Sequence, residues 1–331
     1  MTISCAKPSL DIIIVNWNSG EQLGNCLTSI AEASRDEFIL ARVCVVDNAS
    51  QDDSLKNIES YKLPIQIVRN NANRGFAAAC NQGAKESQAD YLLFLNPDIR
   101  LHTDSLTRPL TFMQQPTASD AGIVGIQLID DNGEISRSCT RFPTPRHFFS
   151  KMLGMDRMLP RYCPSHFMLE WDHKESREVD QVMGAFFLVR RPLFELLHGF
   201  DERFFVYFED LDFSIRARQA GWKSFYLAEA QAYHKGGGTS AQVKSTRLFF
   251  FLRSRILYGY RHFNPVAATG LALGTLILEP SVRLVWTTVR CSCKEAVETI
   301  KGYLKLWRST PIILKEAWKQ KRYENSGFKS L

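Results

Sequence analysis

The chain has 331 residues, of which 45 % are hydrophobic and 23 % are charged. These proportions are ordinary for a globular protein, and they exclude a disordered chain, a collagen-like fibre and a multi-span membrane protein. The net charge of +6 is small but unevenly distributed, because residues 244–331 carry 16 Lys and Arg against 5 Glu. This asymmetry predicts an anionic ligand or surface for the C-terminal part.

The sequence favours a cytoplasmic location. Its first ten residues are polar, and the next apolar run, residues 12–15, is too short for the core of a secretory signal. None of the eight cysteines forms a CxxC pair, and Cys44 and Cys80 stand in runs typical of buried thiols. Cys291 and Cys293 leave metal binding or acylation open. We therefore expect the reducing environment of the cytoplasm.

Strand and helix patterns alternate through the first hundred residues. Residues 12–16 are apolar and β-branched, as in a buried strand, and residues 21–33 follow with apolar residues at helical spacing. Because the strands are continuously apolar, the pattern predicts an α/β fold with a mostly parallel sheet and helices on both faces. Further strands are predicted at 42–46, 65–68 and 91–95, and further helices at 52–60 and 75–87.

The second half of the chain changes character along its length. Residues 137–177 are rich in Pro, His and aromatic residues, and we expect an irregular flap or acceptor loop there. We expect an α/β catalytic domain over residues 1–243 and a basic, aromatic helical region over residues 244–331. Predicted strands lie at 122–129, 179–189 and 224–228, with predicted helices at 209–220 and 248–263.

A polar cluster follows the second predicted strand, at the edge where open α/β sheets bind their ligands. It consists of Asp47, Asn48 and Ser50, with Asp52 and Ser54 close behind. A carboxylate at a strand end can accept hydrogen bonds from a base or a ribose. The same residues are equally typical of an Asx turn followed by a helix N-cap.

A second cluster, Asn73, Arg74 and Gly75, leads into the helix predicted at 75–87. Glycine permits a close approach of the backbone to a ligand, a helix N-terminus attracts phosphate, and the arginine adds a cation. A helix cap beside a solvated arginine is the alternative interpretation.

Two further strand ends carry possible metal ligands. Asn96, Pro97 and Asp98 follow the strand 91–95, and a carboxylate there suits Mg²⁺ or Mn²⁺, which prefer oxygen ligands. His234 precedes a glycine-rich loop and could reach a metal or a diphosphate. The alternatives are a simple turn at Asn96–Asp98 and a structural histidine.

Three carboxylates, Glu209, Asp210 and Asp212, begin the helix predicted at 209–220. Like charges in close proximity raise the pKa of one member, which suits a general base. The aromatic approach over residues 204–208 indicates partial burial, and this favours a functional site over a charge-capped helix.

Taken together, these segments resemble family 2 glycosyltransferases, which are inverting enzymes with a GT-A fold that use nucleotide sugars. The resemblance covers residues 10–240 and is closest to bacterial rhamnosyltransferases that extend lipid-linked glycans for O-antigen or cell-wall synthesis. The matching segments are Ile13–Asn18, Asp47–Ser50, Asn73–Phe76, Leu95–Asp98, Met183–Ala185, Glu209–Asp212 and His234–Ser240.

The resemblance implies a role for each matching residue. Asp210 would be the catalytic base, with Glu209 and Asp212 as supporting carboxylates. Asp98 and His234 would hold a divalent cation, Mg²⁺ or Mn²⁺, although Asn96 replaces the first carboxylate of the family's Asp-x-Asp motif. Gly184 and Ala185 would leave room for the acceptor. The nucleotide-sugar pocket would include Val15, Asn16, Asn18, Asp47, Asn48, Ser50, Asn73, Arg74, Gly75 and Asn96.

The implied reaction is the transfer of a sugar, with L-rhamnose from dTDP-rhamnose as the first candidate, to a lipid-linked glycan. A UDP-sugar such as UDP-galactose, UDP-glucose or UDP-N-acetylglucosamine is the alternative donor. A metal-dependent nucleotidyltransferase would place a cation in the loop after the first strand, but residues 17–21 contain none. A relative that binds nucleotide sugar without catalysis is a further alternative.

The basic C-terminal region indicates contact with a membrane surface. Residues 265–278 are almost wholly apolar, but they are fewer than the roughly 20 that a span needs, and Glu279, Pro280 and Arg283 interrupt the run. A basic helical region with three tryptophans suits a position in the interface of the inner leaflet. The alternatives are a helical hairpin packed on the protein and a dimer contact. No nucleic-acid-binding motif is evident.

Overall fold

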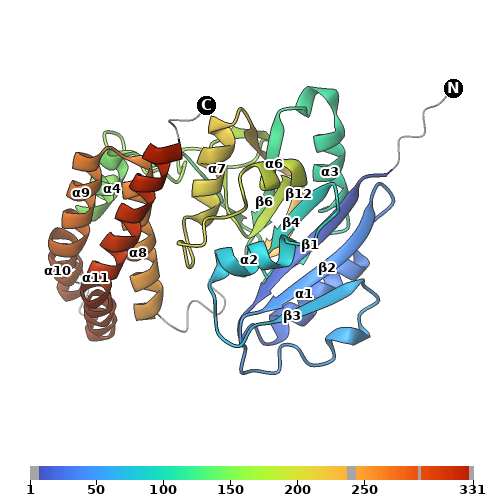
Figure 1. Ribbon diagram of the computed structural model, residues 1–331, viewed down its shortest axis with the longest axis horizontal. Coiled ribbons are helices and arrows are strands. Elements are labelled where there is room, and N and C mark those ends of the chain that lie inside the picture. The colour runs from blue at the N-terminus through green and yellow to red at the C-terminus, as the bar shows by residue number, and fades with distance from the viewer. Residues whose placement is uncertain (1–6, 237–243, 290–291, 328–331) are drawn as a thin grey trace. The chain divides into compact units, whose positions relative to one another are not determined.

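The computed structural model describes residues 7–236, 244–289 and 292–327 (Figure 1). The chain divides into two compact units that are not consecutive in sequence, and some of their bounds fall outside the described residues. Unit 1 takes in Met1–Phe142, Phe167–Glu202 and Glu209–Thr239, and unit 2 takes in Pro143–His166, Arg203–Phe208 and Ser240–Leu331.

Unit 1 is built on a mixed sheet in which the main strands run in one direction. The strand order is β3-β2-β1-β4-β11-β6-β12-β5, and β11 and β5 run against their neighbours. The short strands β7 and β9 pair with β6 and β12. The strands are β1 (Ser9–Asn16), β2 (Ile39–Asp47), β3 (Ile65–Arg69), β4 (Tyr91–Leu95), β5 (Ile99–Leu101), β6 (Ala121–Ile129), β7 (Ile135–Ser136), β9 (Arg177–Val179), β11 (Phe186–Arg190) and β12 (Lys223–His234).

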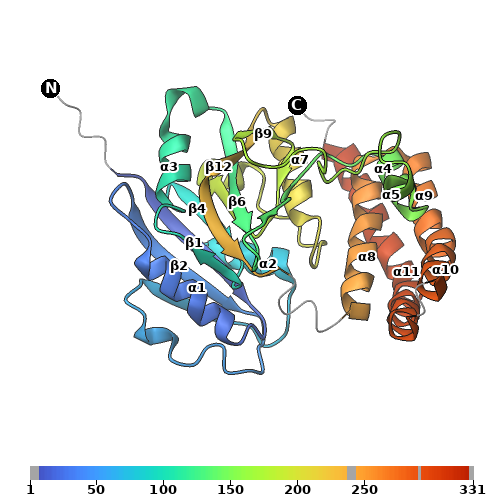
Figure 2. The same cartoon turned by 180° about the vertical axis from the view of Figure 1, so that it is seen from behind.

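Helices cover both faces of this sheet (Figures 1 and 2). Alternate residues of β1 point to opposite sides, so that Ile12 and Ile14 pack with α1 and α3, whereas Ile13 and Val15 pack with α2, α6 and α7. The predicted parallel sheet with two covered faces is thereby confirmed. The helices are α1 (Glu21–Glu32), α2 (Phe76–Ala84), α3 (Thr107–Gln114), α6 (Arg191–Leu196) and α7 (Glu209–Gln219).

Two of the predicted elements are wrong. Residues 52–60 form only a 3₁₀ turn at Ile58–Ser60, because the Asp52 carboxylate accepts hydrogen bonds from the Ser54 amide and hydroxyl and from the Gly20 amide. Such local bonds compete with a helix. The strand predicted at 179–189 is broken into β9, β10 (Gln181–Val182) and β11, and β10 pairs with β8 (Cys139–Thr140) in a separate ribbon.

Unit 2 is helical. Part of the segment expected to be irregular, 137–177, forms two short helices here. The unit contains α4 (Pro145–Met152), α5 (Met155–Met158), α8 (Lys244–His262), α9 (Pro265–Leu273), a π-helical stretch (Gly274–Leu278), α10 (Glu279–Val289) and α11 (Cys293–Gly327).

Helical structure continues past the apolar run at 265–278, through Glu279 and Pro280, and extends from Pro265 to Val289. The ring of Pro280 blocks the usual helical bond to the Leu276 carbonyl. The indole Nε1 of Trp307 donates to that carbonyl at 2.9 Å, and the π-helical stretch lies just before the proline. These features let the helix pass through the proline.

A buried ion pair holds the interior of unit 2. The Arg255 guanidinium contacts the Glu279 carboxylate and donates to the Thr275 hydroxyl at 2.9 Å. Arg283 contacts the other oxygen of Glu279 at 2.8 Å. Removing one partner from such a buried network leaves an uncompensated charge, so these residues tie α8 to the π-helical stretch and to the start of α10.

Candidate active site

The loops after β1 and β2 are joined by the side chain of Asn16. Its Nδ2 lies 2.9 Å from Asp47 Oδ1 and 2.8 Å from Ser54 Oγ, and its Oδ1 accepts from the Ser19 hydroxyl. Asn16 is fully buried, and its amide is occupied by these bonds. It therefore supports the loops of the predicted nucleotide-sugar pocket, and Asp47 is buried beside it, where its Oδ2 accepts from the Ser50 amide at 3.3 Å.

Asn48 joins this loop to the start of α2. Its Nδ2 donates to the Gly75 carbonyl at 3.1 Å, and its Oδ1 accepts from the Asn70 amide at 2.9 Å. Ala49 has a left-handed backbone with φ of 63°, a strained conformation for a residue with a side chain. Ser50 Oγ accepts from the Asn18 amide at 3.0 Å, so the strained turn after β2 is bonded to the loop after β1.

The second cluster combines a cap with an exposed cation. Asn73 Oδ1 accepts from the Gly75 amide at 2.9 Å, and Gly75 has φ of 89°, a conformation that glycine adopts at little cost. The Asn73 side chain thus closes a local turn onto Gly75, which is itself the N-cap residue of α2 and has no side-chain cap hydrogen bond. The Arg74 side chain is exposed at the start of α2, where it can meet an anion.

The possible metal ligands of β4 and β12 lie side by side. Asp98 Oδ2 is 3.5 Å from His234 Nε2, and the Lys235 amide donates to the Asp98 carbonyl. Within the described residues no group of three or more His, Cys, Asp or Glu side chains gathers in this way. Two protein ligands fit a cation that takes its other oxygens from a bound diphosphate, as Mg²⁺ commonly does.

Asp210, the second residue of α7, has the hydrogen bonds of a fixed carboxylate. Its Oδ2 accepts from the Gly184 amide at 2.8 Å and from Gln181 Nε2 at 2.9 Å, and its Oδ1 accepts from the Leu211 amide at 2.8 Å. Burial raises the pKa of Asp210 above its usual value, although these bonds act in the opposite direction. A carboxylate with a raised pKa accepts a proton more readily, which suits a general base.

Glu209, beside it, is also buried. Within the described part of the chain, its Oε2 has no hydrogen-bond partner. Burial and the neighbouring charge of Asp210 raise the pKa of Glu209 well above its ordinary value. The two carboxyl groups therefore favour a state in which one of them keeps a proton.

Asp212 contacts a different residue. Its carboxylate accepts from Arg216 Nε at 2.8 Å, and the same guanidinium donates to the carbonyls of Leu197 and Gly199. This bridge ties α7 to the end of α6. Asp212 therefore supports the helix that carries Asp210.

A short backbone link joins Asp210 to the end of β4. Gly184 donates to Asp210, and the carbonyl of the next residue, Ala185, accepts from the Asn96 amide at 2.9 Å. A Cβ at position 184 would lie 3.2 Å from Asp210 Oδ2, so glycine permits the close approach of the carboxylate. Ala185 is buried in the core, where it spaces these two segments.

Sequence reasoning missed Gln181. Its Oε1 accepts from the Thr140 hydroxyl at 2.6 Å, which orients the amide so that Nε2 faces Asp210. A buried amide within an apolar run, three residues before Gly184, was the available signal. The surrounding strand had no other feature that separated this glutamine from a surface residue.

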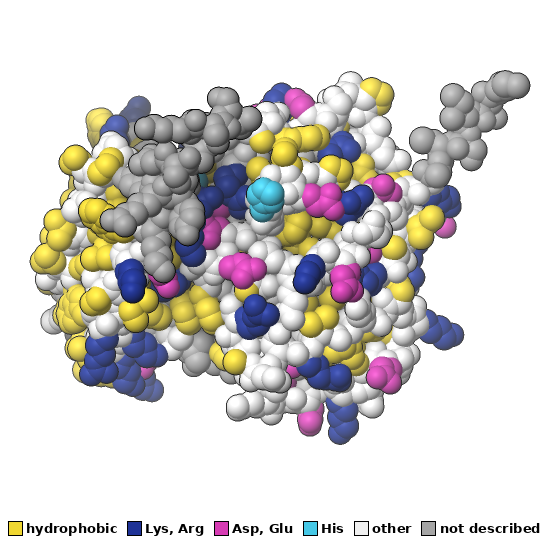
Figure 3. All heavy atoms as spheres, viewed as in Figure 1, with side chains coloured by type: hydrophobic (Ala, Val, Ile, Leu, Met, Phe, Trp, Pro, Cys, Tyr) yellow, Lys and Arg dark blue, Asp and Glu magenta, His cyan; other side chains and the backbone are white. Residues whose placement is uncertain are grey.

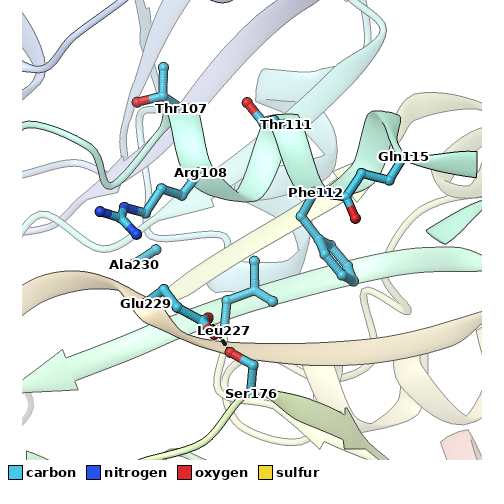
Figure 4. A pocket seen from close by; sticks show the side chains of 9 residues that line it. All are labelled: Thr107, Arg108, Thr111, Phe112, Gln115, Ser176, Leu227, Glu229 and Ala230. Atoms are coloured by element: carbon cyan, nitrogen blue, oxygen red, sulfur yellow. Dashed lines mark hydrogen bonds between the residues drawn. The ribbon is translucent and has the colours of Figure 1, made fainter. Parts of the chain in front are cut away.

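A cavity of about 410 Å³ lies elsewhere in unit 1, between α3 and β12 (Figure 4). Phe112 and Leu227 line it, with Arg108 and Glu229 at its polar side. None of the predicted site residues lines this cavity. The predicted site residues lie instead at the carboxyl ends of β1, β2 and β4 and at the start of α7, the edge where open α/β sheets bind ligands.

Residues 11–174 match the model of the family described as glycosyl transferase family 2. This part of the chain is a glycosyl transferase family 2 domain. The match ends before α7, but Asp210 follows in the chain order that the family resemblance predicts. This glycosyltransferase therefore bears out the family, the fold class and the enzyme class that its motifs indicated.

Curated relatives extend the likeness beyond the matched domain. The N-acetylglucosaminyl-diphospho-decaprenol L-rhamnosyltransferase of Mycobacterium tuberculosis is 27 % identical over 266 residues, which cover 72 % of this chain and 83 % of that protein. The hexosyltransferase Agl10 of low-salt glycan biosynthesis in Haloferax volcanii is 26 % identical over 75 % of this chain and 74 % of its own. The rhamnosyltransferase WbbL of Escherichia coli is 30 % identical over 51 % of this chain and 61 % of its own.

Solved structures share the fold. The mannosyltransferase PcManGT of Pyrobaculum calidifontis, in complex with GDP-mannose and Mn²⁺, superposes with a TM-score of 0.54 and 16 % identity over 91 % of this chain and 87 % of its own. Residues 1–349 of TarS from S. aureus, in complex with UDP-GlcNAc, superpose with a TM-score of 0.51 and 17 % identity over 89 % and 79 % of the two chains.

Proposed function

We propose that this glycosyltransferase transfers L-rhamnose from dTDP-rhamnose to a hydroxyl of a polyprenyl-diphosphate-linked glycan, with inversion at the anomeric carbon. The observation that carries the proposal is the Asp210 carboxylate, fixed by the Gly184 amide and joined through Ala185 to the end of β4. The likeness to the mycobacterial enzyme named for L-rhamnose transfer to a lipid diphosphate supports the choice of sugar and acceptor.

In this mechanism Asp210 takes the proton of the acceptor hydroxyl while the oxygen attacks the anomeric carbon. The bond to the nucleoside diphosphate breaks on the opposite face, so the configuration inverts. General-base help of this kind contributes roughly 10²–10⁴-fold to the rate. Glu209 keeps the surroundings of Asp210 short of water and, when it is protonated, adds no second negative charge.

Asp98 and His234 would hold a divalent cation, Mg²⁺ or Mn²⁺. When bound, such an ion offsets the charge that develops on the departing diphosphate. The exposed Arg74 at the start of α2 would meet the same diphosphate. In this proposal Asp47 and Ser50 face the nucleoside, and Asn16 and Asn48 hold their loops in place.

We also propose that unit 2 rests on the inner face of the plasma membrane. By length and composition alone, Pro265–Val289 meets the requirement for a membrane span, with a mean hydropathy of 1.3, but a core helix of a soluble protein can meet the same requirement. Figure 3 shows hydrophobic side chains exposed over the helices of unit 2, with Lys and Arg among them. The exposed residues include Val266, Leu273, Ile277, Val285 and Val289 along the helical segment 265–289, and Val297, Ile300, Leu304 and Trp307 on α11.

The charge of unit 2 supports a lipid surface with anionic headgroups. Lys294, Lys301, Lys305 and Arg308 lie on α11 among these apolar residues, and each cation near such a surface adds about 1 kcal/mol of binding. A surface of this kind would bring the enzyme to an acceptor that is anchored by its lipid.

The donor is tested by the release of nucleoside diphosphate from a panel of sugars. The panel is dTDP-rhamnose, UDP-glucose, UDP-galactose, UDP-N-acetylglucosamine and GDP-mannose, each with Mg²⁺ or Mn²⁺ and a membrane lipid extract. Release from dTDP-rhamnose that depends on the extract is the expected result. Release from a UDP-sugar alone would keep the transferase and reject rhamnose as the sugar.

The membrane proposal is tested by sedimentation with vesicles. Binding to vesicles with anionic lipid, weakened at least severalfold by Ile277→Ser with Val285→Ser, is expected. Ile39→Ser is the matched control, since Ile39 is an exposed isoleucine of unit 1. Equal sedimentation of both variants, or none of the unchanged protein, would contradict the proposal.

A further inference from the structure

The segment Arg203–Phe208 leads directly into α7, yet it packs within unit 2. It ends one residue before Glu209 and two before Asp210. Its last two residues, Tyr207 and Phe208, both have left-handed backbones, with φ of 68° and 71°. Two consecutive aromatic residues in this region are sterically unfavourable, so their surroundings must impose the conformation.

Helix α8 supplies those surroundings through hydrogen bonds to the backbone of the segment. Ser254 Oγ donates to the Val206 carbonyl at 2.9 Å, and Arg253 Nη1 donates to the Arg203 carbonyl at 2.6 Å. Ser254 is fully buried within the helix. A serine has no intrinsic advantage at a buried helical position, and this bond explains its presence there.

Aromatic contacts with the same helix complete the support. The ring of Phe205 stacks on Phe250, with centroids 4.2 Å apart and planes inclined by 7°. Phe208 is buried against Phe251 and Tyr258, with both centroid distances at 5.4 Å. The carbonyls and rings of the segment thus contact α8, and Phe208 also contacts Phe148 of α4.

We propose that Ser254 and Arg253 are positioning residues for Asp210. They hold Arg203–Phe208 in the strained conformation from which α7 begins, and the place where α7 begins decides where the Asp210 carboxylate lies. Upstream, Asn81 holds Phe200 by bonds of 2.8 Å to its amide and its carbonyl, so the segment is fixed at both ends. The inference rests on the proposed role of Asp210 as the base.

Positioning of a base acts on the rate and leaves donor binding unchanged, because neither Ser254 nor Arg253 belongs to the proposed donor pocket. A displacement of about 1 Å from the reacting geometry can cost a factor of about 10². We expect Ser254→Ala to lower kcat about 10-fold with the KM for the donor unchanged. Alanine is a better helix former than serine, so α8 itself is not weakened by this change.

The experiment compares two variant pairs in the full chain, with dTDP-rhamnose or whichever donor the panel identifies and with membrane lipid extract. Ser254→Ala is paired with Arg247→Ala, an exposed position of α8. Arg253→Ala is paired with Glu316→Ala, which removes the other partner of Arg253, 2.7 Å away, and leaves the bond to Arg203 in place. Thermal unfolding of each variant checks that the fold is intact.

A fall in kcat for Ser254→Ala and Arg253→Ala, with KM unchanged and both controls active, is the expected result. Two outcomes would overturn the inference while leaving the proposed function intact. One is equal kcat in variants and controls when Asp210→Asn is inactive, and the other is a raised donor KM with unchanged kcat. Full turnover by Asp210→Asn would instead reject Asp210 as the base, whatever the other variants show.

Discussion

Each unit contains a glutamate removed from water, Glu209 in unit 1 and Glu279 in unit 2, with exposed fractions of 6 % and 3 %. Their pKa values move in opposite directions. Burial and the charge of Asp210 raise the pKa of Glu209 well above normal. Burial acts in the same direction on Glu279, but Arg255 and Arg283 outweigh it and hold its pKa below the usual value.

The difference shows that burial alone does not decide what a carboxylate does. A buried carboxylate between two guanidinium groups is a permanent charge, and it serves the packing of helices. A buried carboxylate beside another carboxylate is a group that readily gains a proton, and it serves chemistry. In unit 1, the buried carboxyl groups that lie beside each other are those of Glu209 and Asp210 at the start of α7, and Asp210 accepts a hydrogen bond from the Gly184 amide.

The largest expected effect is on the base itself. Asp210→Asn keeps the shape of the side chain and removes its ability to take a proton, so turnover should fall by about 10²–10⁴-fold. Donor affinity, measured by titration calorimetry, should stay within about threefold. Asp104→Asn, at an exposed ion pair of unit 1, is the control and should stay active. Unchanged turnover in Asp210→Asn would show that the carboxyl pair in unit 1 does not serve catalysis.

Removing the charge of Glu279 should mainly affect stability. Glu279→Gln leaves Arg255 and Arg283 facing a neutral amide in a buried place, and a broken buried pair costs about 3–5 kcal/mol. Urea unfolding of the full chain measures this loss. Replacing both members, as Arg255→Met with Glu279→Leu, should recover most of it. A single variant as stable as the unchanged protein would show that the pair does not hold unit 2.

A smaller effect on kcat is expected from a substitution at Gly184, whose amide donates to Asp210. Gly184→Ala places a Cβ 3.2 Å from Asp210 Oδ2, so the carboxylate must shift by a few tenths of an ångström. We expect kcat to fall about 10-fold while the melting temperature changes by a few degrees at most. Gly133→Ala, at an exposed turn, is the control for stability alone. If Gly184→Ala lowered the stability without changing kcat, the contact between Gly184 and Asp210 would not matter for turnover.

The smallest effect separates the two glutamates by pH. Because the folded pKa of Glu209 lies above its ordinary 4.5, the folded chain binds more protons than the unfolded chain between these values. The free energy of unfolding therefore falls as the pH rises through that window, and Glu209→Gln should remove the slope. The lowered pKa of Glu279 acts in reverse, since its stabilisation is present above the ordinary 4.5 and is lost as the pH falls.

Urea unfolding from about pH 2.5 to pH 8, a range that extends well below the ordinary pKa of Glu279, checks both signs. The unchanged protein and Glu209→Gln should converge at acid pH and separate at neutral pH, where the variant is the more stable. Glu279→Gln should lose its disadvantage as the pH falls. Parallel curves for all three proteins would show that neither carboxyl group has a shifted pKa.

Local patterns predicted the part of the fold that positions the site. The apolar run of β4 and its polar end at Asn96 and Asp98 were evident in sequence, because a buried parallel strand needs continuous apolar residues and its end needs a turn. The helix predicted at 52–60 failed because the Asp52 side chain bonds to neighbouring backbone groups. No periodicity reports such a bond.

By itself, the sequence determined the order of the motifs, the family they resemble and the candidate base at position 210, since each depends on residue types at short spacing. Only the tertiary structure decided which of these side chains are held by hydrogen bonds to other parts of the protein. It turned Asn16 and Asp212 into supports, brought Gln181 to Asp210, and set Ser254 beneath the segment before α7. These bonds join residues of separate elements, and their partners are fixed by packing rather than by spacing along the chain.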